Sequence, residues 1–299
     1  MTDLKTHDTT GRAATGPAPP SPTGAALGGE PGPERTGVLE TARRAVSTAL
    51  AAAVGLGVLV LIWAWASTYV RELPSPATTF ATLWDLLSRP FYDNGPNDKG
   101  IAVQLGASLG RVFKGFAAAA LVGVPFGLLL GASKWAWKAA NPVVQLLRPV
   151  SPLAWFPIWL VILKDAPKAA VWVIVITALW PIVLNTAAGA GAVPRDHRNV
   201  ARVFRFGRVA YVRHVLLPDS LPSIVTGLRQ SMGVAWMVIV AVEMLSGGTG
   251  IGFFIWDSYN ALNLSKVISA LLVVGAVGLV LDLLFLRLGK AVAVEGVQA

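Results

Sequence analysis

The chain has 299 residues, of which 54% are hydrophobic and only 14% are charged, and its formal net charge is +9 at pH 7. Soluble domains carry about 25% charged residues, whereas the charges here are clustered and leave long apolar runs between them. A soluble globular protein is therefore excluded. The runs predict an all-α polytopic membrane protein with about six transmembrane helices.

The composition also argues against several chemistries. The absence of cysteine excludes disulfides and thiolate metal sites, and the three histidines are scattered, so we expect no metal site and no cofactor. The lysines and arginines lie in short loops beside apolar runs, as membrane orientation requires, so we expect no nucleic-acid binding. No catalytic motif stands in a plausible setting, and an enzyme is not expected.

The N-terminal third begins with a segment that cannot bury a core. Residues 1–40 are rich in Gly, Pro, Thr and Ala, which predicts a disordered cytoplasmic tail. The apolar run after Arg43 and Arg44 is too long for a signal peptide, so we expect a first transmembrane helix over about 46–67. Residues 77–88 are amphipathic and predict a helix at the membrane interface.

A second span is expected over about 110–132, and it is rich in glycine. Besides Gly115, it contains Gly123, Gly127 and Gly131, which lie four residues apart on one helix face. This spacing lets two membrane helices approach closely. Glycine is also simply common in membrane helices, so the pattern alone leaves both interpretations open.

A third span, about 140–163, contains four prolines and one charge, Arg148; the prolines are Pro142, Pro149, Pro152 and Pro157. Prolines at this density predict a kink or an unwound stretch, which a bilayer tolerates only where protein or a water-filled cavity covers the backbone. We therefore expect this span to face the interior.

Three further spans complete the expected topology, over about 169–189, 222–246 and 266–288. The transmembrane domain then covers residues 41–290, and residues 291–299 form a short C-terminal tail.

Between the fourth and fifth spans lies an arginine-rich segment, with arginines at 195, 198, 202, 205, 208 and 213 opposed only by Asp196 and Asp219. The positive-inside bias places this segment, and with six spans both termini, in the cytoplasm. Arg111 and Lys114 fall on the outer side of the second span and count against the rule.

Apolar residues of this segment recur at near-helical spacing: Val200, Val203, Phe204 and Phe206. An apolar face beside a cationic one suits either docking of another protein or binding to anionic lipid. Pro218 and Pro222 are expected to end the amphipathic section and restart the chain into the membrane.

Several short motifs resemble those of one transporter family. NVAR (199–202), LLP (216–218), GLR (227–229) and AVEML (241–245) look like the EAA loop of ABC importer permeases. The resemblance implies a type I ABC importer permease fold and a cytoplasmic coupling loop, residues 195–218, that docks on a separate ATPase subunit. The resemblance implies that the residues of this chain that take part in docking on the ATPase are Arg198, Asn199, Val200, Ala201, Arg202, Phe204, Arg205, Leu217 and Pro218. A general member of the family has Glu at 199 and Gly at 205, so Asn199 and Arg205 depart from its pattern.

Four longer stretches resemble the branch of that family serving nitrate, nitrite, cyanate and bicarbonate. They are PFYDNGPNDKGI (90–101), LRPVSPLAW (147–155), NVARVFR (199–205) and GGTGIGFFIWDSYNALNLSKVI (247–268). The resemblance implies a permease of the bacterial inner membrane that imports a small inorganic anion, most simply nitrate or nitrite. Bicarbonate, cyanate, or the sulfonates and taurine of a neighbouring branch remain open.

The same resemblance implies the partners: ATP-binding cassette ATPase subunits that hydrolyse the ATP, a periplasmic or lipid-anchored substrate-binding protein, and a second permease copy. A secondary transporter without an ATPase is the alternative from another class. It predicts an inverted repeat and buried acid–base pairs, and neither is convincing in this sequence.

Ionisable residues inside the spans are candidates for function because charge is costly in lipid. Arg148, in the proline-broken span, and Arg229 are the candidates for an anion pathway. Glu243 would repel an anion and is expected to pair with a cation or cap the outer end, whereas Asp282 is expected to be an interfacial charge. The glycine-rich run 247–252 lacks the Lys-Ser/Thr of a phosphate-binding loop and is expected to be a flexible outer loop.

Overall fold

The structure is a computed structural model that describes residues 36–95 and 98–298. Most of the expected N-terminal tail, residues 1–35, lies outside the described residues. The chain divides into two compact units at Gly57, within the first helix, α1 (Thr36–Tyr69). In the second unit, described from Val58 onward, every regular element is a helix apart from one isolated bridge between Asp93 and Lys99.

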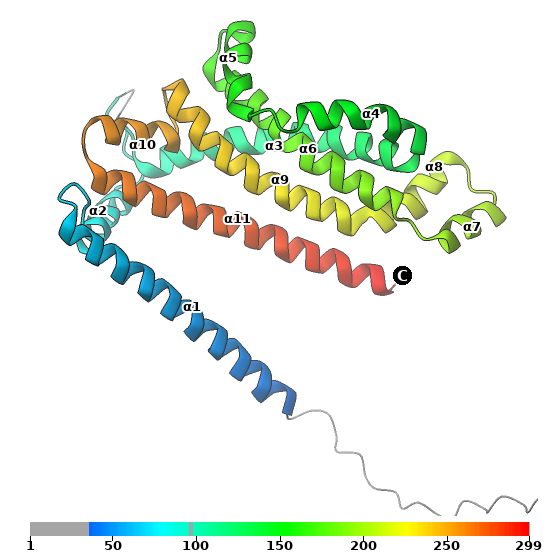
Figure 1. Cartoon of the computed structure of the whole chain (residues 1–299), viewed down its shortest axis with the longest axis horizontal. Helices are drawn as coiled ribbons and strands as arrows, with labels where there is room; N and C mark the ends of the chain where they lie inside the picture. Colours follow the sequence, from blue (N-terminus) through cyan, green and yellow to red (C-terminus); the bar gives the residue numbers. More distant parts are fainter. Residues whose placement is uncertain (1–35, 96–97, 299) are drawn as a thin grey trace, which may run out of the picture. The chain divides into compact units, whose positions relative to one another are not determined.

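Ten α-helices and one short π-helical segment follow α1 (Figure 1). In chain order they are α2 (Pro76–Ser88), α3 (Ile101–Ala132), α4 (Lys134–Leu147), α5 (Pro152–Leu163), α6 (Ala166–Gly191), α7 (Arg195–Val203), α8 (Arg208–Tyr211), the π segment (Val212–Leu216), α9 (Leu217–Ser246), α10 (Ile251–Asn260) and α11 (Leu264–Gln298). The all-α fold expected from the sequence is confirmed.

Five helices in the described part of the chain are long and apolar enough to cross a membrane. They span Val46–Tyr69, Ile101–Ala132, Ala166–Gly191, Arg208–Ser246 and Leu264–Lys290. The bent pair α4–α5 makes a sixth if it is counted as one span. Two boundaries differ from the expectation: α3 begins at Ile101 rather than near 110, and α11 continues through most of the expected C-terminal tail, to Gln298.

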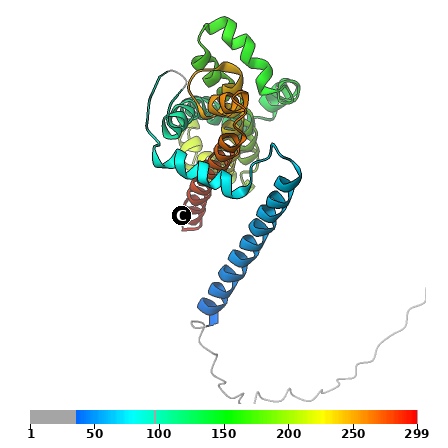
Figure 2. The same cartoon turned by 90° about the vertical axis from the view of Figure 1, so that its left-hand side faces the viewer.

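The long helices α3, α6, α9 and α11 lie side by side, with α6 packed between α3 and α9 (Figures 1 and 2). Their shared core is apolar and includes Val112, Ile174, Ile239 and Ala270. The amphipathic helix α2, confirmed near its expected range, packs against α11, where the buried Ser269 hydroxyl donates to the Thr79 carbonyl at 3.1 Å. One end of this bundle carries α2 and α10, and the other carries α7 and α8 (Figure 1).

The glycines of α3 lie where this helix meets α6. A Cβ atom added at Gly127 would lie 2.6 Å from the Thr186 Cβ, and one added at Gly115 would lie 2.7 Å from the Ile174 Cβ. At Gly131 it would overlap the Ala187 carbonyl. Of the two interpretations of this glycine pattern, close helix approach is therefore the one that holds.

The expected third span is broken, as its prolines predict, but it is two helices rather than one. α4 ends at Leu147 and α5 begins at Pro152, and the two are bent by 91°. The break lines a cavity shared with α6 and α9, and α5 packs on the core, as expected of a segment that faces the interior. Most side chains of the pair are nevertheless not buried within this chain, since Val144 is the only buried residue of α4 and Phe156 the only one of α5. The stacked rings of Trp159 and Trp172, 4.9 Å apart, hold α5 against α6.

Candidate functional site

The arginine-rich segment forms a helical hairpin at the end of the bundle opposite α10 (Figure 1). α7 ends in a turn in which the Phe206 amide donates to the Ala201 carbonyl at 2.9 Å and the Arg205 amide to the Arg202 carbonyl at 3.0 Å. This pair of bonds is the Schellman motif, whose turn residue adopts the left-handed conformation and is usually glycine. Arg205 holds that conformation here, with φ of 50°.

The outward face of this hairpin is apolar. We define the exposed apolar patch as Val200, Val203, Phe204, Phe206, Val209 and Val212, of which Phe204 is 71% and Val209 81% exposed. Exposed arginines surround it, since Arg202, Arg205 and Arg208 all lie at the surface. Large apolar side chains ringed by cationic ones are the composition of a docking surface.

Ala201 does not belong to this patch. Ala201 is 5% exposed, and it lines a surface pocket of about 530 Å³ together with other hairpin residues, namely Arg198, Arg202, Arg205, Phe206 and Tyr211. Close approach of a partner at Ala201 stays a prediction. The hairpin is also tied to the bundle: the Arg198 guanidinium donates to the Gly191 carbonyl at 3.0 Å, and His197 Nδ1 lies 2.8 Å from Asp219 Oδ2. The hairpin is therefore anchored to the ends of α6 and α9.

The expected break at Pro218 and Pro222 is absent. From Arg208 to Ser246 the chain is a single helical run, in which the π turn Val212–Leu216 leads directly into α9. Pro218 lies just after this π turn, in which the Leu217 amide bonds to the Val212 carbonyl, five residues back instead of four. Two residues of the exposed apolar patch, Val209 and Val212, therefore lie on the same helical run as α9, whereas the other four precede it in α7 and the turn.

A cavity of about 460 Å³ lies beside the break between α4 and α5. Its charged residue is Arg148, and Asn185 of α6, Gln230 of α9 and Thr177 of α6 supply further polar groups. The remaining wall is apolar and includes two tryptophans (Val150, Pro152, Trp155, Ile176, Trp180, Pro181, Leu184 and Val234). Sequence reasoning selected Arg148 but missed Asn185 and Gln230; a polar residue inside a span was the available signal.

Arg229 is not part of this cavity. It lies between α9 and α11, where its Nε and Nη2 each donate to an Asp282 carboxylate oxygen at 2.7 Å. Two parallel bonds of this kind balance the guanidinium charge. Asp282 is therefore bound to Arg229, and its position at the membrane interface stays a prediction. The structure does not bring Arg148 and Arg229 together.

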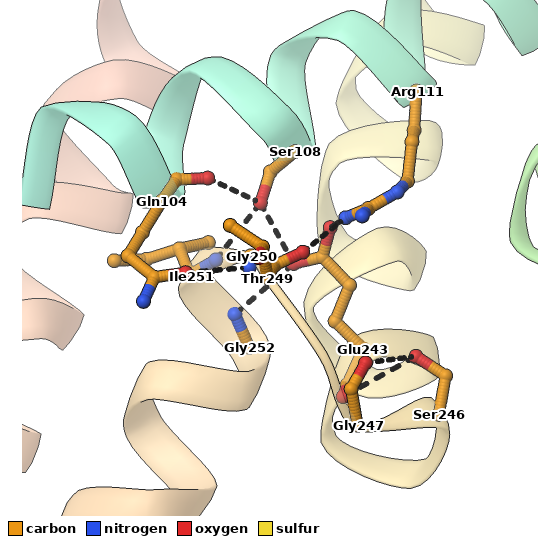
Figure 3. A network of polar contacts seen from close by, with 10 residues as sticks. All are labelled: Gln104, Ser108, Arg111, Glu243, Ser246, Gly247, Thr249, Gly250, Ile251 and Gly252. Atoms are coloured by element: carbon orange, nitrogen blue, oxygen red, sulfur yellow. Dashed lines mark hydrogen bonds and ion pairs between the residues drawn. The ribbon is translucent and has the colours of Figure 1, made fainter. Parts of the chain in front are cut away.

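A polar cluster occupies the opposite end of the bundle, where α3, α9 and the start of α10 meet (Figure 3). Glu243 is only 1% exposed. Its Oε1 accepts from Arg111 at 2.6 Å, and its Oε2 accepts from the Ser108 hydroxyl at 2.7 Å and from the Gly252 amide at 3.1 Å. The expectation that Glu243 pairs with a cation is confirmed. The pair also explains why Arg111 departs from the positive-inside bias: its charge is compensated.

The glycine-rich run 247–252 is bonded to this cluster and is not the expected flexible loop. The Gly250 amide donates to Gln104 Oε1 at 2.6 Å, the Ile251 amide donates to Ser108 Oγ at 2.9 Å, and Arg111 donates to the Thr249 carbonyl at 2.6 Å (Figure 3). The glycines are needed because Gly250 has a φ of 155° and lies against Glu243, where no Cβ fits. The run is therefore fixed to α3 at this end of the bundle.

Across the described residues, no three His, Cys, Asp or Glu side chains converge as a metal site would require. The described chain combines membrane-spanning helices, an exposed apolar patch at one end and a cavity with one arginine beside the break between α4 and α5. These features are those of a polytopic membrane protein of the transporter class.

Comparison with known proteins gives the family. Residues 123–294 match the family described as "Binding-protein-dependent transport system inner membrane component". The chain is 51% identical over 210 residues, 70% of this chain and 76% of the relative, to the nitrate import permease protein NrtB of Synechocystis sp.. It is 45% identical over 219 residues to the bicarbonate transport system permease protein CmpB of Synechococcus elongatus, covering 72% of this chain and 79% of that one.

Among solved structures, the methionine ABC transporter MetNI in an inward-facing conformation matches with a TM-score of 0.59 at 17% identity, covering 64% of this chain and 95% of that one. At this identity the likeness concerns the fold, which is that of a type I ABC importer permease. The chain belongs to the family of binding-protein-dependent transport system inner membrane components. It is a multi-pass membrane protein and a permease subunit.

Proposed function

We propose that this chain is the permease subunit of an ATP-driven importer for nitrate or nitrite. The observation that carries the proposal is the 51% identity over 210 residues to a nitrate import permease, against 45% for the bicarbonate permease compared above. The cavity beside Arg148 agrees with this substrate class, because its lining contains one positive charge and no carboxylate. Bicarbonate is the second candidate, on the strength of that same relative.

ATP hydrolysis is assigned to separate ATPase subunits that dock on the exposed apolar patch. Phe204 and Val203, 71% and 78% exposed, are the anchors of this docking, and the surrounding arginines, with Asn199, form its polar rim. Leu217 and Pro218 begin the helix that carries the movement of the patch into the membrane. The continuous helical run Arg208–Ser246 connects this end of the bundle with the membrane and supports such a transmission.

The remaining assembly follows the same proposal. A periplasmic or lipid-anchored binding protein delivers the anion at the α10 end, and a second copy of this chain completes the pathway. The arginine-rich hairpin and both termini lie in the cytoplasm of a bacterial cell, with the chain in its inner membrane. Arg148 is a pathway residue in this assignment. Arg229 serves the pathway only when its bonds to Asp282 open.

The test is uptake of isotopically labelled nitrate by cells that carry or lack the gene, with nitrite, bicarbonate and cyanate as competitors. We expect uptake to be lost on deletion and restored by the wild-type gene. Uptake that is unchanged by deletion, or that bicarbonate alone abolishes, would move the assignment to another anion.

The docking prediction concerns Phe204→Asp, which places a charge at the centre of the exposed apolar patch. We expect this variant to insert in the membrane but to lose the ATPase on co-purification, and to fall to below about a tenth of wild-type uptake, since central aromatic anchors contribute about 2 kcal/mol or more. Phe91→Asp is the matched control, because Phe91 is 76% exposed and lies near α2, away from the hairpin. If the Phe204→Asp variant still co-purifies with the ATPase subunit, the docking assignment is wrong.

A further inference from the structure

The polar groups of the Arg148 cavity form an ordered arrangement. The Asn185 side-chain amide donates to the Pro181 carbonyl at 2.8 Å and to Gln230 Oε1 at 3.1 Å. Asn185 therefore links two turns of α6 to a facing residue of α9. The first of these bonds fixes the Asn185 carboxamide against its own helix, and the second fixes the direction of Gln230.

The direction of Gln230 determines what the cavity offers. Because Gln230 Oε1 accepts from Asn185, its NH₂ group is turned away from that bond, and within the described structure it has no protein partner. Thr177 uses its hydroxyl proton on the Val173 carbonyl at 2.7 Å. The unused hydrogen-bond donors of the cavity thus include the Gln230 NH₂ and the Arg148 guanidinium, beside the indole N–H groups of Trp155 and Trp180.

Arg148, at the exposed end of α4, differs from the two arginines of α3 and α9 in having no acidic partner among the described residues. Arg111 is bound by Glu243 and Arg229 by Asp282. In the described part of the chain no carboxylate lies within 4.0 Å of the Arg148 guanidinium, and its side chain has no hydrogen bond. One uncompensated positive charge beside an oriented amide donor favours an anion that carries hydrogen-bond acceptors and a single negative charge.

The size of the cavity fits such an anion. A water molecule occupies about 30 Å³ in the liquid, so about 460 Å³ holds a small oxyanion together with several waters. The bound anion keeps part of its hydration and exchanges the rest for Arg148 and Gln230. Binding of this kind is weak enough to let the anion leave, as transport requires.

We propose that Asn185 and Gln230, with Arg148, form a transient binding site for a univalent oxyanion, in which Gln230 donates to the anion and Asn185 sets the direction of that donor. The assignment rests on the proposed function and deepens it. It also predicts selection against divalent anions, because one guanidinium compensates one charge and the lining supplies no second cation.

Gln230→Glu is the decisive variant, because it keeps the shape of the side chain, removes the donor and adds a negative charge to the cavity. We expect its maximal uptake of the transported anion to fall at least about tenfold, the loss that removal of one charge-assisted hydrogen bond gives. Gln230→Met, without the charge, is expected to raise KM by about threefold to tenfold with a smaller change in maximal rate. Asn185→Leu is expected to resemble Gln230→Met.

The control is Lys290→Gln, which makes the charge more negative by the same one unit at an exposed position of α11, outside the cavity, the exposed apolar patch and the α10 end. We expect it to transport normally. Co-purification with the ATPase reports assembly of every variant, since Gln230 is exposed and its substitution leaves the core intact.

The panel of labelled substrates is nitrate, nitrite, bicarbonate, cyanate and taurine, with sulfate as the divalent competitor. If the wild type carries only taurine, the proposed function is wrong. The binding site can still be tested in that case, because the same variants report whether it binds the sulfonate group of taurine. If Gln230→Glu carries the wild-type substrate at an unchanged rate, the site assignment is overturned whichever substrate it is. Equal inhibition by sulfate and by a univalent anion contradicts the selectivity.

Discussion

At the scale of single residues, Arg205 shows how a departure from a family pattern becomes a physical statement. The family has glycine at this position, and the structure explains why: the turn after α7 needs a left-handed residue, and Arg205 adopts φ of 50°. A residue with a Cβ in this conformation costs about 1–2 kcal/mol. The hairpin therefore carries local strain beside its exposed apolar patch.

We expect Arg205→Gly to stabilise this turn by up to about 1 kcal/mol, because glycine adopts the left-handed conformation without a steric cost. The measurement is hydrogen exchange at the Phe206 amide, which bonds to the Ala201 carbonyl and reports opening of the turn. Arg205→Ala is the control, since it removes the same charge and keeps the Cβ. Equal protection in the Gly and Ala variants would show that the charge, and not the backbone, sets the stability of the turn.

Residue-level roles were predictable from sequence only in part. Burial cost predicted that Glu243 has a cationic partner, but that partner, Arg111, is 132 residues away in sequence and only folding brings the two together. The same distance hid the role of Ser108 and Gln104, which hold the glycine-rich run. The sequence was enough to predict that Glu243 needs a cationic partner. The identity of that partner depends on how α3 packs on α9, which the sequence does not show.

At the scale of elements, periodicity and small residues identified the helices and their contacts, while proline was harder to interpret. The break between α4 and α5 lies at Pro149 and Pro152, as expected. Pro218 and Pro222, in contrast, lie inside one helical run. Pro218 lies just after the π turn, and Pro222 lies inside α9, where a proline removes one backbone hydrogen bond without ending the helix. The π turn at Val212–Leu216 precedes this site, and no sequence pattern signalled it.

The contact between α3 and α6 gives a prediction at this scale. Gly127→Val would place side-chain atoms against Thr186 and Val183, whose nearest atoms lie 2.6 Å and 2.9 Å from an added Cβ. We expect a loss of about 1–3 kcal/mol, as for other overpacked cores, seen as a lower thermal unfolding midpoint of the purified protein. Gly106→Val on the same helix is the control, because nothing lies within 4 Å of its added Cβ. Equal midpoints would rule out a tight contact at Gly127.

At the scale of the whole transmembrane bundle, the direction of the helices decides how many times the chain crosses. Gly115 of α3 faces Ile174 of α6, and Gly131, sixteen residues on, faces Ala187 and Ala190. Residue numbers thus rise in the same direction along α3 and α6, so the two helices are parallel. The chain between them must run back from one end of the bundle to the other, and α4–α5 is the segment that does so despite its 91° bend. Hydropathy alone does not distinguish such a segment from a loop that re-enters on one side.

The absence of cysteine makes this arrangement directly testable, because wild-type protein gives no background with a thiol reagent. Lys134→Cys and Arg208→Cys lie at the arginine-rich end of the bundle, and Lys168→Cys and Asn260→Cys lie at the other, all at exposed positions. With a membrane-impermeant maleimide on intact cells, we expect labelling of the second pair only, and of the first pair after permeabilisation. The reverse pattern would invert the orientation. Labelling of Lys134→Cys and Lys168→Cys from the same side would mean that α4–α5 does not cross, and the parallel packing of α3 and α6 would then need another explanation.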